Sequence, residues 1–345
     1  MIKTAIVTGA CSGIGLALSK GESEVQPAPQ QWRVVLADIN DKAYEAIKAS
    51  LPLSRAKGAN AENHVFVRTD VSNWNDMVNL FRAAFEWPGE GQGAIDFVAC
   101  NAGIDDIVLR NGLLDDDDNK DNEAEAPVPT QPDLRVLQVD LHSNFFATRL
   151  LVHYTRKTKR RRRLSSPPIL ETATATANGD WTPKMVVTAS MAAQYPFFLI
   201  PQYTAAKHGC LGLVRALSPA LLKHEGITLN CVMPGTVDTG LIPQPVLAQW
   251  PKEHLTPLDT VIRAYMELIG DWDRATMSER VASDAVDRDL KNGCAVECSA
   301  DWLWYRDPVP FMDESMRFVA EQSKEEGILG RFTAELKVKM KSTKS

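Results

Sequence analysis

The segment Thr8-Gly9-Ala10-Cys11-Ser12-Gly13-Ile14-Gly15 decides the fold of this chain of 345 residues. It follows the apolar run Ala5-Ile6-Val7 and opens a helix-permissive stretch. Its glycines let the backbone turn tightly and approach a pyrophosphate, whose charge is met by free N–H groups at a helix N-terminus. A glycine-rich turn alone is a weak signal. Its place between a strand and a helix is what predicts a dinucleotide site.

Strand-like and helix-permissive segments alternate along the chain after this turn. Short apolar runs, typical of buried parallel strands, occupy residues 5–7, 34–37, 65–67, 97–99, 185–188 and 228–232. Helix-permissive stretches lie at 41–50, 75–85 and 204–224. This alternation is typical of βαβ units, so we predict an α/β fold with a Rossmann-type, doubly wound parallel sheet.

Three segments interrupt the alternation. The glycine and prolines of 21–31 shorten the first helix, as either a loop insertion or an irregularity in the gene model would. Residues 113–133 and 155–183 are poor in large apolar side chains, and we predict disordered insertions there. The expected organisation is a single domain, with the dinucleotide-binding part at 1–241 and a substrate lid and C-terminal extension at 242–345.

The second insertion contains the basic run 159–163 (KRRRR). Such a run could act as a nuclear-localisation signal or a nucleic-acid patch, or it could be a solvated loop. No aromatic residue is interleaved with the basic ones, and the whole chain has a net charge of -6. We therefore expect no nucleic-acid partner.

The bulk composition leads us to expect a soluble protein of the cytoplasm. Lysines and arginines number 38 and acidic residues 44, which gives no sign of a polyanion-binding or membrane-surface protein. No apolar run approaches the roughly 18 residues of a membrane span, and no signal peptide is expected. No cysteine pair has CxxC spacing, so we expect no metal site and six reduced, buried thiols: Cys11, Cys100, Cys210, Cys231, Cys294 and Cys298.

Asp38 ends the second predicted strand, roughly 20 residues beyond the turn, where an acid grips the adenosine ribose 2′-OH. A carboxylate repels a 2′-phosphate, and no lysine or arginine follows immediately. NAD is therefore favoured over NADP. The alternative is that Asp38 simply caps the next helix.

Five ordered motifs run from residue 4 to residue 241. They are TGxxxGIG at 8–15, Asp70-Val71, NAG at 101–103, YxxxK at 203–207 with Ser190 thirteen residues before the tyrosine, and Pro234-Gly235 with Val237 and Thr239. Together they resemble the classical short-chain dehydrogenase/reductase family. The resemblance implies that the cofactor is bound by Gly9, Ser12, Gly13, Ile14, Gly15, Asp38, Asp70, Val71, Asn101, Ala102, Gly103, Tyr203, Lys207, Pro234, Gly235, Val237 and Thr239.

The catalytic residues implied by the resemblance are Ser190, Tyr203 and Lys207. Hydride transfer between a secondary alcohol and a ketone needs a group that takes or gives a proton. The pKa of tyrosine is about 10, but a lysine ammonium one helical turn away and the positive nicotinamide of the cofactor both favour the phenolate. Ser190 would hold the substrate oxygen. The alternative for Tyr203 and Lys207 is an ordinary pair on an amphipathic helix.

Asp140 stands where the family has a fourth catalytic residue, an asparagine. Its main chain could still support the proton relay, but its charge is expected to raise the pKa of Lys207. We therefore count Asp140 among the catalytic residues. The alternative is a non-redox or regulatory NAD-binding protein of the same fold, such as a cyclase or sensor.

The segments beside the catalytic residues are apolar. The stretch 195–200 (YPFFLI) would line the pocket, and 241–250 occupies the place of the family's mobile lid. They indicate a hydrophobic small-molecule substrate, such as a polyketide, terpenoid or lipid alcohol. Residues 292–318 are similar to the branch with 15-hydroxyprostaglandin dehydrogenase and fungal biosynthetic dehydrogenases. The family resemblance also implies a dimer or tetramer.

Overall fold

The computed structural model describes residues 2–21, 32–51, 63–89, 91–106, 131–165, 181–270, 281–282 and 290–342. Its strands are β1 (Lys3–Thr8), β2 (Trp32–Asp38), β3 (His64–Arg68), β4 (Phe97–Cys100), β5 (Lys184–Thr188), β6 (Thr228–Pro234), β7 (Val281–Ala282), β8 (Ala295–Ser299) and β9 (Trp302–Tyr305). Its α-helices are α1 (Gly13–Lys20), α2 (Asp41–Ile47), α3 (Trp74–Glu86), α4 (Arg135–Leu137), α5 (Ser143–Ser165), α6 (Pro201–Glu225), α7 (Gln244–Leu247), α8 (Leu258–Ile269), α9 (Glu314–Gln322) and α10 (Ile328–Ser342). The short η segments are η1 (Lys48–Ser50), η2 (Gln138–His142), η3 (Met191–Ala193) and η4 (Lys252–His254), of which η2 is a π-helix.

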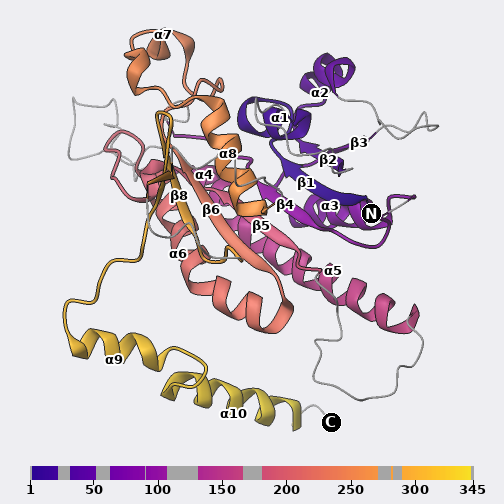
Figure 1. Cartoon of the computed structure of the whole chain (residues 1–345), viewed down its shortest axis with the longest axis vertical. Helices are drawn as coiled ribbons and strands as arrows, with labels where there is room; N and C mark the ends of the chain where they lie inside the picture. The colour runs from indigo at the N-terminus through magenta and orange to yellow at the C-terminus, as the bar shows by residue number, and fades with distance from the viewer. Residues whose placement is uncertain are drawn as a thin grey trace, which may run out of the picture. The chain divides into compact units, whose positions relative to one another are not determined.

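The strands form a nine-stranded sheet in the order β3-β2-β1-β4-β5-β6-β8-β9-β7 (Figure 1). From β3 to β8 every neighbouring pair is parallel, while β9 is antiparallel to β8. The predicted Rossmann-type sheet is confirmed. The strand order reverses between β1 and β4, and ligands of such sheets bind at the carboxyl ends of the strands beside that reversal.

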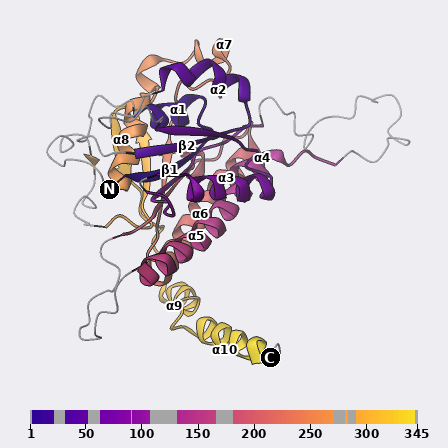
Figure 2. The same cartoon turned by 90° about the vertical axis from the view of Figure 1, so that its right-hand side faces the viewer.

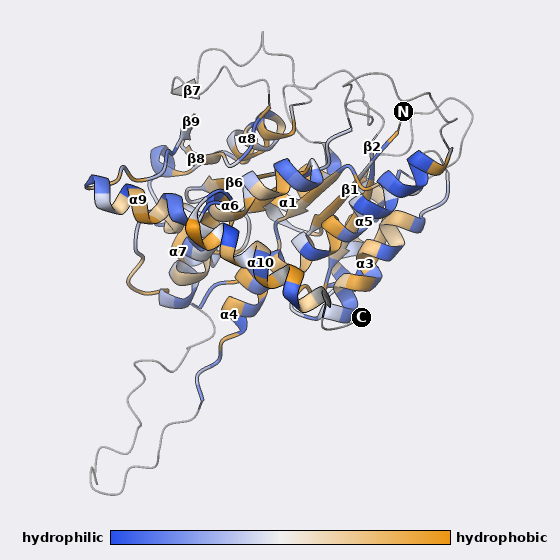
Figure 3. Cartoon of the chain, turned by 90° about the horizontal axis from the view of Figure 1, so that it is seen from below, coloured by the Kyte–Doolittle hydropathy of each residue, from blue (hydrophilic) through white to orange (hydrophobic). Residues whose placement is uncertain are grey.

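Helices cover both faces of this sheet. In Figure 2, α1 and α8 lie on one side of the strands and α3, α5 and α6 on the other. Each side has its own apolar core, one built on Phe81, Leu151 and Leu229, the other on Val7 and Tyr265. Hydrophobic and hydrophilic bands alternate along α3 and α5 in Figure 3, as burial of one helix face requires. The two cores fix the strand ends that carry the site.

The expected strands and helices appear where the sequence pattern places them. The first helix is short, as predicted, because Gly21 ends it in the left-handed conformation at φ 66°. Residues 22–31 lie outside the described part of the chain, as do 107–130, which hold most of the first predicted insertion.

The prediction of a disordered insertion at 155–183 is wrong over its first eleven residues, because α5 continues to Ser165. Thr158 is buried and donates a hydrogen bond to the carbonyl of Gly93 at 2.7 Å, while Arg156 pairs with Glu225. The guanidinium of Arg161 lies 4.5 Å from the centre of the Phe85 ring. The basic run has no aromatic residue of its own, but Phe85 on α3 supplies an aromatic contact to it from a distant part of the chain. Residues 166–180 lie outside the described part.

The chain divides into two compact units, Met1–Arg306 and Asp307–Ser345. Much of the expected C-terminal extension, from 242 to Arg306, therefore belongs to the first unit. In the second unit, α9 buries none of its residues. No helix of the described residues is long and apolar enough to cross a membrane.

Candidate active site

The glycine-rich turn between β1 and α1 is closely packed. Gly9 and Gly13 have φ values of 64° and 49°, which disfavour any residue with a Cβ. A Cβ on Gly15 would lie 2.1 Å from the carbonyl oxygen of Gly9 and 2.7 Å from the Nδ2 atom of Asn101. A Cβ on Gly13 would meet Thr239 at 2.7 Å. The backbone of the turn therefore requires glycine at these positions, as in a turn that brings a pyrophosphate to the start of a helix, and this fits a dinucleotide.

Asp38 lies at the end of β2 beside this turn. Its Oδ2 atom accepts a hydrogen bond from the N–H of Cys11, and its Oδ1 atom accepts one from the N–H of Asn40, both at 3.0 Å. The side chain of Asn40, and not Asp38, caps α2 by accepting from the N–H of Ala43. The capping alternative for Asp38 is therefore wrong. The carboxylate is fixed against the turn, as a ribose-binding acid would be.

Asn101 and Ala102 follow β4, and their hydrogen bonds link the glycine-rich turn after β1 to the end of β5. The Thr8 hydroxyl accepts hydrogen bonds from the N–H groups of both residues, at 2.9 and 3.0 Å. The Asn101 side chain donates to the Thr8 carbonyl and accepts from the Thr188 hydroxyl. Asn101, one of the predicted cofactor residues, thus connects the ends of three neighbouring strands, β1, β4 and β5.

The remaining predicted cofactor residues lie after other strands of the same sheet. Asp70 follows β3, where its Oδ1 atom accepts from the N–H and the hydroxyl of Ser72. After β6, the Gly235 N–H donates to Cys298, and a Cβ on Gly235 would lie 2.7 Å from the Thr256 hydroxyl. The others are Ser12, which precedes α1 and is exposed, Ile14 in α1, buried Val71 and Val237, and Pro234, the last residue of β6.

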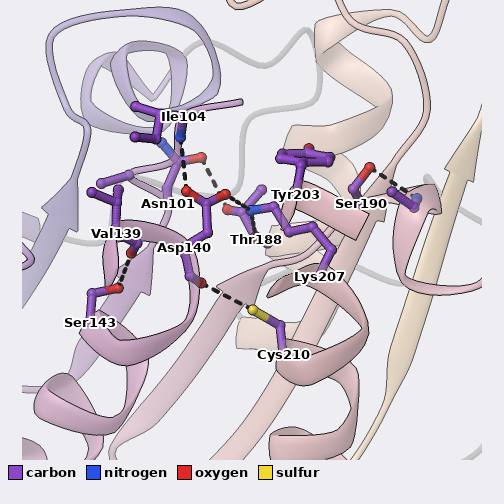
Figure 4. A network of polar contacts seen from close by, with 12 residues as sticks. Asn101, Ile104, Val139, Asp140, Ser143, Thr188, Ser190, Tyr203, Lys207 and Cys210 are labelled. Carbon is purple, nitrogen blue, oxygen red and sulfur yellow. Dashed lines mark hydrogen bonds and ion pairs between the residues drawn. The ribbon is translucent and has the colours of Figure 1, made fainter. Parts of the chain in front are cut away.

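The predicted catalytic residues come together on β5, η3 and α6, as Figure 4 shows. Ser190 is buried between β5 and η3, and its hydroxyl accepts from the N–H of Ala192 at 3.1 Å. Lys207 is one helical turn after Tyr203 on α6, and its Nζ atom lies 5.2 Å from the centre of the Tyr203 ring. The same Nζ atom donates to the carbonyl of Thr188 at 2.9 Å.

Asp140 reaches this cluster from the π-helical segment η2. Its Oδ2 atom lies 2.9 Å from the Nζ atom of Lys207, and both side chains are buried. Its Oδ1 atom accepts from the N–H of Ile104 at 2.9 Å. Gly103 lies so close that a Cβ there would be 3.0 Å from Oδ2. Asp140 therefore contacts the lysine directly through its carboxylate.

The protein groups set unusual pKa values in this cluster. Burial lowers the pKa of Lys207, but the Asp140 carboxylate, together with Tyr203 and Cys210, more than offsets this effect, so the pKa is raised, as the sequence predicts. Burial raises the pKa of Tyr203, and Asp140 adds to that effect. The Lys207 ammonium and a hydrogen bond with Ser190 oppose it without reversing it. Lys207 thus acts on the pKa of Tyr203 in the expected direction, but in the protein alone that pKa is raised.

Asp106 is a residue of the site that sequence reasoning missed. Its two carboxylate oxygens accept from the first free N–H groups of α6, those of Gln202 at 3.0 Å and Tyr203 at 3.3 Å. The residue that precedes α6, Ile200, has no capping side chain. Asp106 follows the NAG motif by only three residues, yet the helix that it caps begins 95 residues later, so no local pattern could reveal the contact.

A cavity of about 530 Å³ opens beside Met191, the residue that follows Ser190. It is formed by the start of η3, the loop after β6 and the segment around η4, which includes part of the predicted lid. Its lining combines apolar residues and glycine (Met191, Phe197, Gly235, Trp250 and Pro251) with as many polar ones (Thr236, Gln249, His254, Thr256 and Ser299). Its size suits a small-molecule substrate.

All six cysteines are free and buried, as predicted. Among the residues that the structure describes, no group of three or more histidine, cysteine or acidic side chains is arranged to hold a metal ion.

Comparison with known proteins identifies the family. The sequence model of the short chain dehydrogenases matches residues 3–161 and 176–246. The chain is 28% identical over 318 residues to the short-chain dehydrogenase/reductase prx6 of Penicillium rubens, across 89% of this chain and 87% of that protein. It is 25% identical to the NADP-dependent dehydrogenase clz5 of Cochliobolus lunatus, across 68% of this chain and 71% of the relative.

Solved structures agree on the fold. The 3-ketoacyl-(acyl-carrier-protein) reductase from Brucella melitensis, complexed with NADH, superposes with a TM-score of 0.56 at 19% identity, covering 86% of this chain and 96% of that one. A family match over more than half of the chain and fungal relatives along most of its length lead to one conclusion. The chain is an oxidoreductase that belongs to the short-chain dehydrogenase family.

Proposed function

We propose that this protein interconverts a secondary alcohol and a ketone on a hydrophobic small molecule, with Tyr203 as the acid or base. The observation that carries the proposal is the position of Tyr203 between Ser190 and Lys207. Two residues that line the cavity, Met191 and Phe197, lie on the segment that joins Ser190 to Tyr203. The residues fit a nicotinamide dinucleotide, which when bound would supply or accept the hydride.

The chain's own residues supply proton transfer and orientation. In the reduction, the carbonyl oxygen gains the electron pair of the C=O bond and takes the proton of the Tyr203 hydroxyl. The Ser190 hydroxyl donates to the same oxygen and stabilises the charge that develops on it. The oxidation runs through the same contacts in reverse, with the Tyr203 phenolate accepting the alcohol proton.

NAD is the proposed cofactor in preference to NADP, because the Asp38 carboxylate is fixed beside the turn, where a 2′-phosphate would be repelled. The fungal relatives and the apolar side chains of Met191, Phe197 and Trp250 in the cavity support a role in secondary metabolism on a polyketide, terpenoid or lipid alcohol. We further infer a cytoplasmic dimer or tetramer, as its six free thiols and the family's usual assembly suggest.

The test combines NADH binding with turnover. Titration with NADH should show binding, and a panel of hydrophobic alcohols and ketones followed by NADH absorbance should reveal a substrate. Tyr203→Phe should then reduce kcat by about 10²–10⁴-fold while NADH binding persists. Tyr154→Phe is the matched control, because Tyr154 packs in the core against Phe85 on α3.

A protein that binds no NAD(H) would refute the proposal. Turnover that survives Tyr203→Phe would instead favour the second candidate, a non-redox or regulatory NAD-binding protein, for which the direct contact between Asp140 and Lys207 is the motivating observation.

A further inference from the structure

Asp140 and Lys207 form a buried ion pair at the centre of the site (Figure 4). The Nζ atom of Lys207 lies between the Asp140 carboxylate and the Thr188 carbonyl, each at 2.9 Å. The Asp140 main-chain oxygen is occupied separately, by Asn144 at 2.7 Å and Cys210 at 3.2 Å. The carboxylate itself therefore acts on the lysine, while the main chain holds the π-helical turn in place.

The charged and titratable groups around Tyr203 come from four elements. Lys207 on α6 is the cation, and Asp140 on η2 and Asp105 after β4 are the anions that act on the tyrosine. Asp106 raises the pKa of Asp140, and the Cys210 thiol raises the pKa of Lys207. Lys207 in turn opposes the rise in the pKa of Tyr265 on α8. Burial keeps the Cys210 thiol neutral, with its pKa raised to about 11.

This arrangement has a simple electrostatic consequence. A lone ammonium beside a tyrosine stabilises the phenolate, but an ammonium paired with a carboxylate at 2.9 Å is a dipole with no net charge. In a buried site, water does little to screen either charge. Burial of Tyr203 then disfavours the phenolate, and the remaining attraction to Lys207 is too weak to reverse that preference.

We propose that Asp140 is a positioning residue that neutralises Lys207 and keeps Tyr203 protonated at neutral pH, so that the enzyme works as a carbonyl reductase there and oxidises alcohols only at alkaline pH. The inference rests on the proposed function, since it concerns the proton that Tyr203 transfers. With Tyr203 protonated, the site without substrate holds the proton that carbonyl reduction requires.

The proton balance explains the direction. Reduction consumes one proton per carbonyl, which the Tyr203 phenol provides, leaving a phenolate that must regain a proton from solvent. Oxidation begins with the phenolate, which takes the alcohol proton. A site in which the phenol persists at neutral pH is ready for reduction and reaches the oxidising form only as the pH rises.

The direct test is to titrate Tyr203 itself, in the intact protein without turnover. The carbon-13 signal of a labelled tyrosine Cζ distinguishes phenol from phenolate, and the Tyr203→Phe spectrum assigns the signal. In the native protein we expect Tyr203 to remain a phenol above pH 10. In Asp140→Asn its pKa should fall by about 1 pH unit or more, because a negative charge is removed beside it.

Rate measurements provide the second test. The midpoint of the pH profile for alcohol oxidation should move to lower pH in Asp140→Asn by the same amount as the tyrosine signal. Cys210→Ser is the matched control, because Cys210 contacts the main-chain oxygen of Asp140 and the side chain of Asn144, and its substitution leaves the Asp140 carboxylate in place. Its midpoint should stay at the native value whatever happens to the maximal rate.

The outcomes separate this inference from the proposed function. A native Tyr203 that ionises below about pH 8 overturns the inference even if Asp140→Asn fails to fold. So does an Asp140→Asn protein with lower activity and unchanged midpoints, which would make Asp140 merely structural. In both cases Tyr203→Phe would still abolish turnover, and the proposed function would stand.

Discussion

At the scale of single residues, Gly15 sets the tightest requirement in the cofactor turn. A Cβ there would lie 2.1 Å from the Gly9 carbonyl oxygen, a distance that only movement of backbone can relieve. We predict that Gly15→Ala lowers the free energy of unfolding by about 1–3 kcal/mol and weakens NADH binding at least about tenfold. Urea denaturation and NADH titration measure the two effects.

The control is Gly212→Ala on the exposed face of α6, where a Cβ has no neighbour within 4 Å. Alanine in a helix interior stabilises by about 0.5–1 kcal/mol relative to glycine. If both variants were equally stable and bound NADH equally well, the close packing of the turn would have no functional role.

Asp38 carries the prediction on cofactor choice. Its carboxylate is fixed by the N–H groups of Cys11 and Asn40, so it cannot swing away from a 2′-phosphate without losing both bonds. We predict that Asp38→Ser weakens NADH binding about 10–100-fold, the range for losing a hydrogen bond to a charged group, and improves NADPH binding. Fluorescence titration of the native protein and of Asp38→Ser with NADH and NADPH measures both changes. A native protein that prefers NADPH would contradict the assignment.

At the scale of elements, the start of α6 depends on a carboxylate from another part of the chain. Asp106 accepts hydrogen bonds from the N–H groups of Gln202 and Tyr203, so the cap holds the backbone of the proposed acid itself. We predict that Asp106→Ala destabilises the protein by about 0.5–2 kcal/mol and lowers kcat, because Tyr203 loses its fixed position. Asp106→Asn retains an acceptor oxygen and should restore most of both properties.

Thermal denaturation and steady-state kinetics would show the effect on α6. If Asp106→Ala lowered stability and left kcat intact, the cap would serve folding alone. If Asp106→Ala changed neither the stability nor kcat, the two hydrogen bonds from Asp106 would stabilise α6 no more than hydrogen bonds from water to the same N–H groups.

Helix α5 shows where sequence patterns fail. Its last turns contain KRRRR and no apolar repeat, so local composition predicts a disordered segment. The helix continues because distant groups stabilise it: Gly93 accepts from Thr158, Glu225 pairs with Arg156, and Phe85 lies under Arg161. Basic side chains at a helix C-terminus also interact favourably with the helix dipole. Contacts between residues so far apart in sequence leave no local signal.

The candidate site also contains features that sequence patterns predict and a contact that they do not. The pairing of Tyr203 with Lys207 could be predicted because their spacing is one helical turn, whereas Ser190 and Asn101 are implied by the family resemblance. The direct contact of Asp140 with Lys207 could not, since it depends on how the π-helical turn η2 presents its side chain to α6.

At the scale of the whole molecule, the parallel sheet gathers motifs that are far apart in sequence. Residues between Thr8 and Thr239 meet because the carboxyl ends of β1, β4, β5 and β6 lie at one edge, and β8 supports the last of them through the bond from Gly235 to Cys298. The antiparallel β9 extends the sheet beyond the motifs. Any change that loosens the strand core therefore affects cofactor and substrate contacts together.

The buried thiols of this core make the whole fold sensitive to alkali. Burial raises the pKa of five thiols, that of Cys210 to about 11 and that of Cys11 to about 12, and those of Cys100, Cys231 and Cys298 also rise. In the unfolded chain a cysteine ionises near pH 8.5. Above that pH the unfolded state binds fewer protons than the folded one, so the free energy of unfolding must fall as the pH rises.

We predict full stability below about pH 8 and a loss of about 1.4 kcal/mol per pH unit for each thiol between about pH 8.5 and 11. Urea denaturation under reducing conditions at a series of pH values measures this slope. Cys231→Ala removes one such thiol from β6, so its slope should be shallower by about 1.4 kcal/mol per pH unit, although the cavity lowers its stability at neutral pH. The slope, and not the absolute stability, is the readout. Equal slopes for the native protein and Cys231→Ala would mean that this thiol ionises without unfolding the sheet.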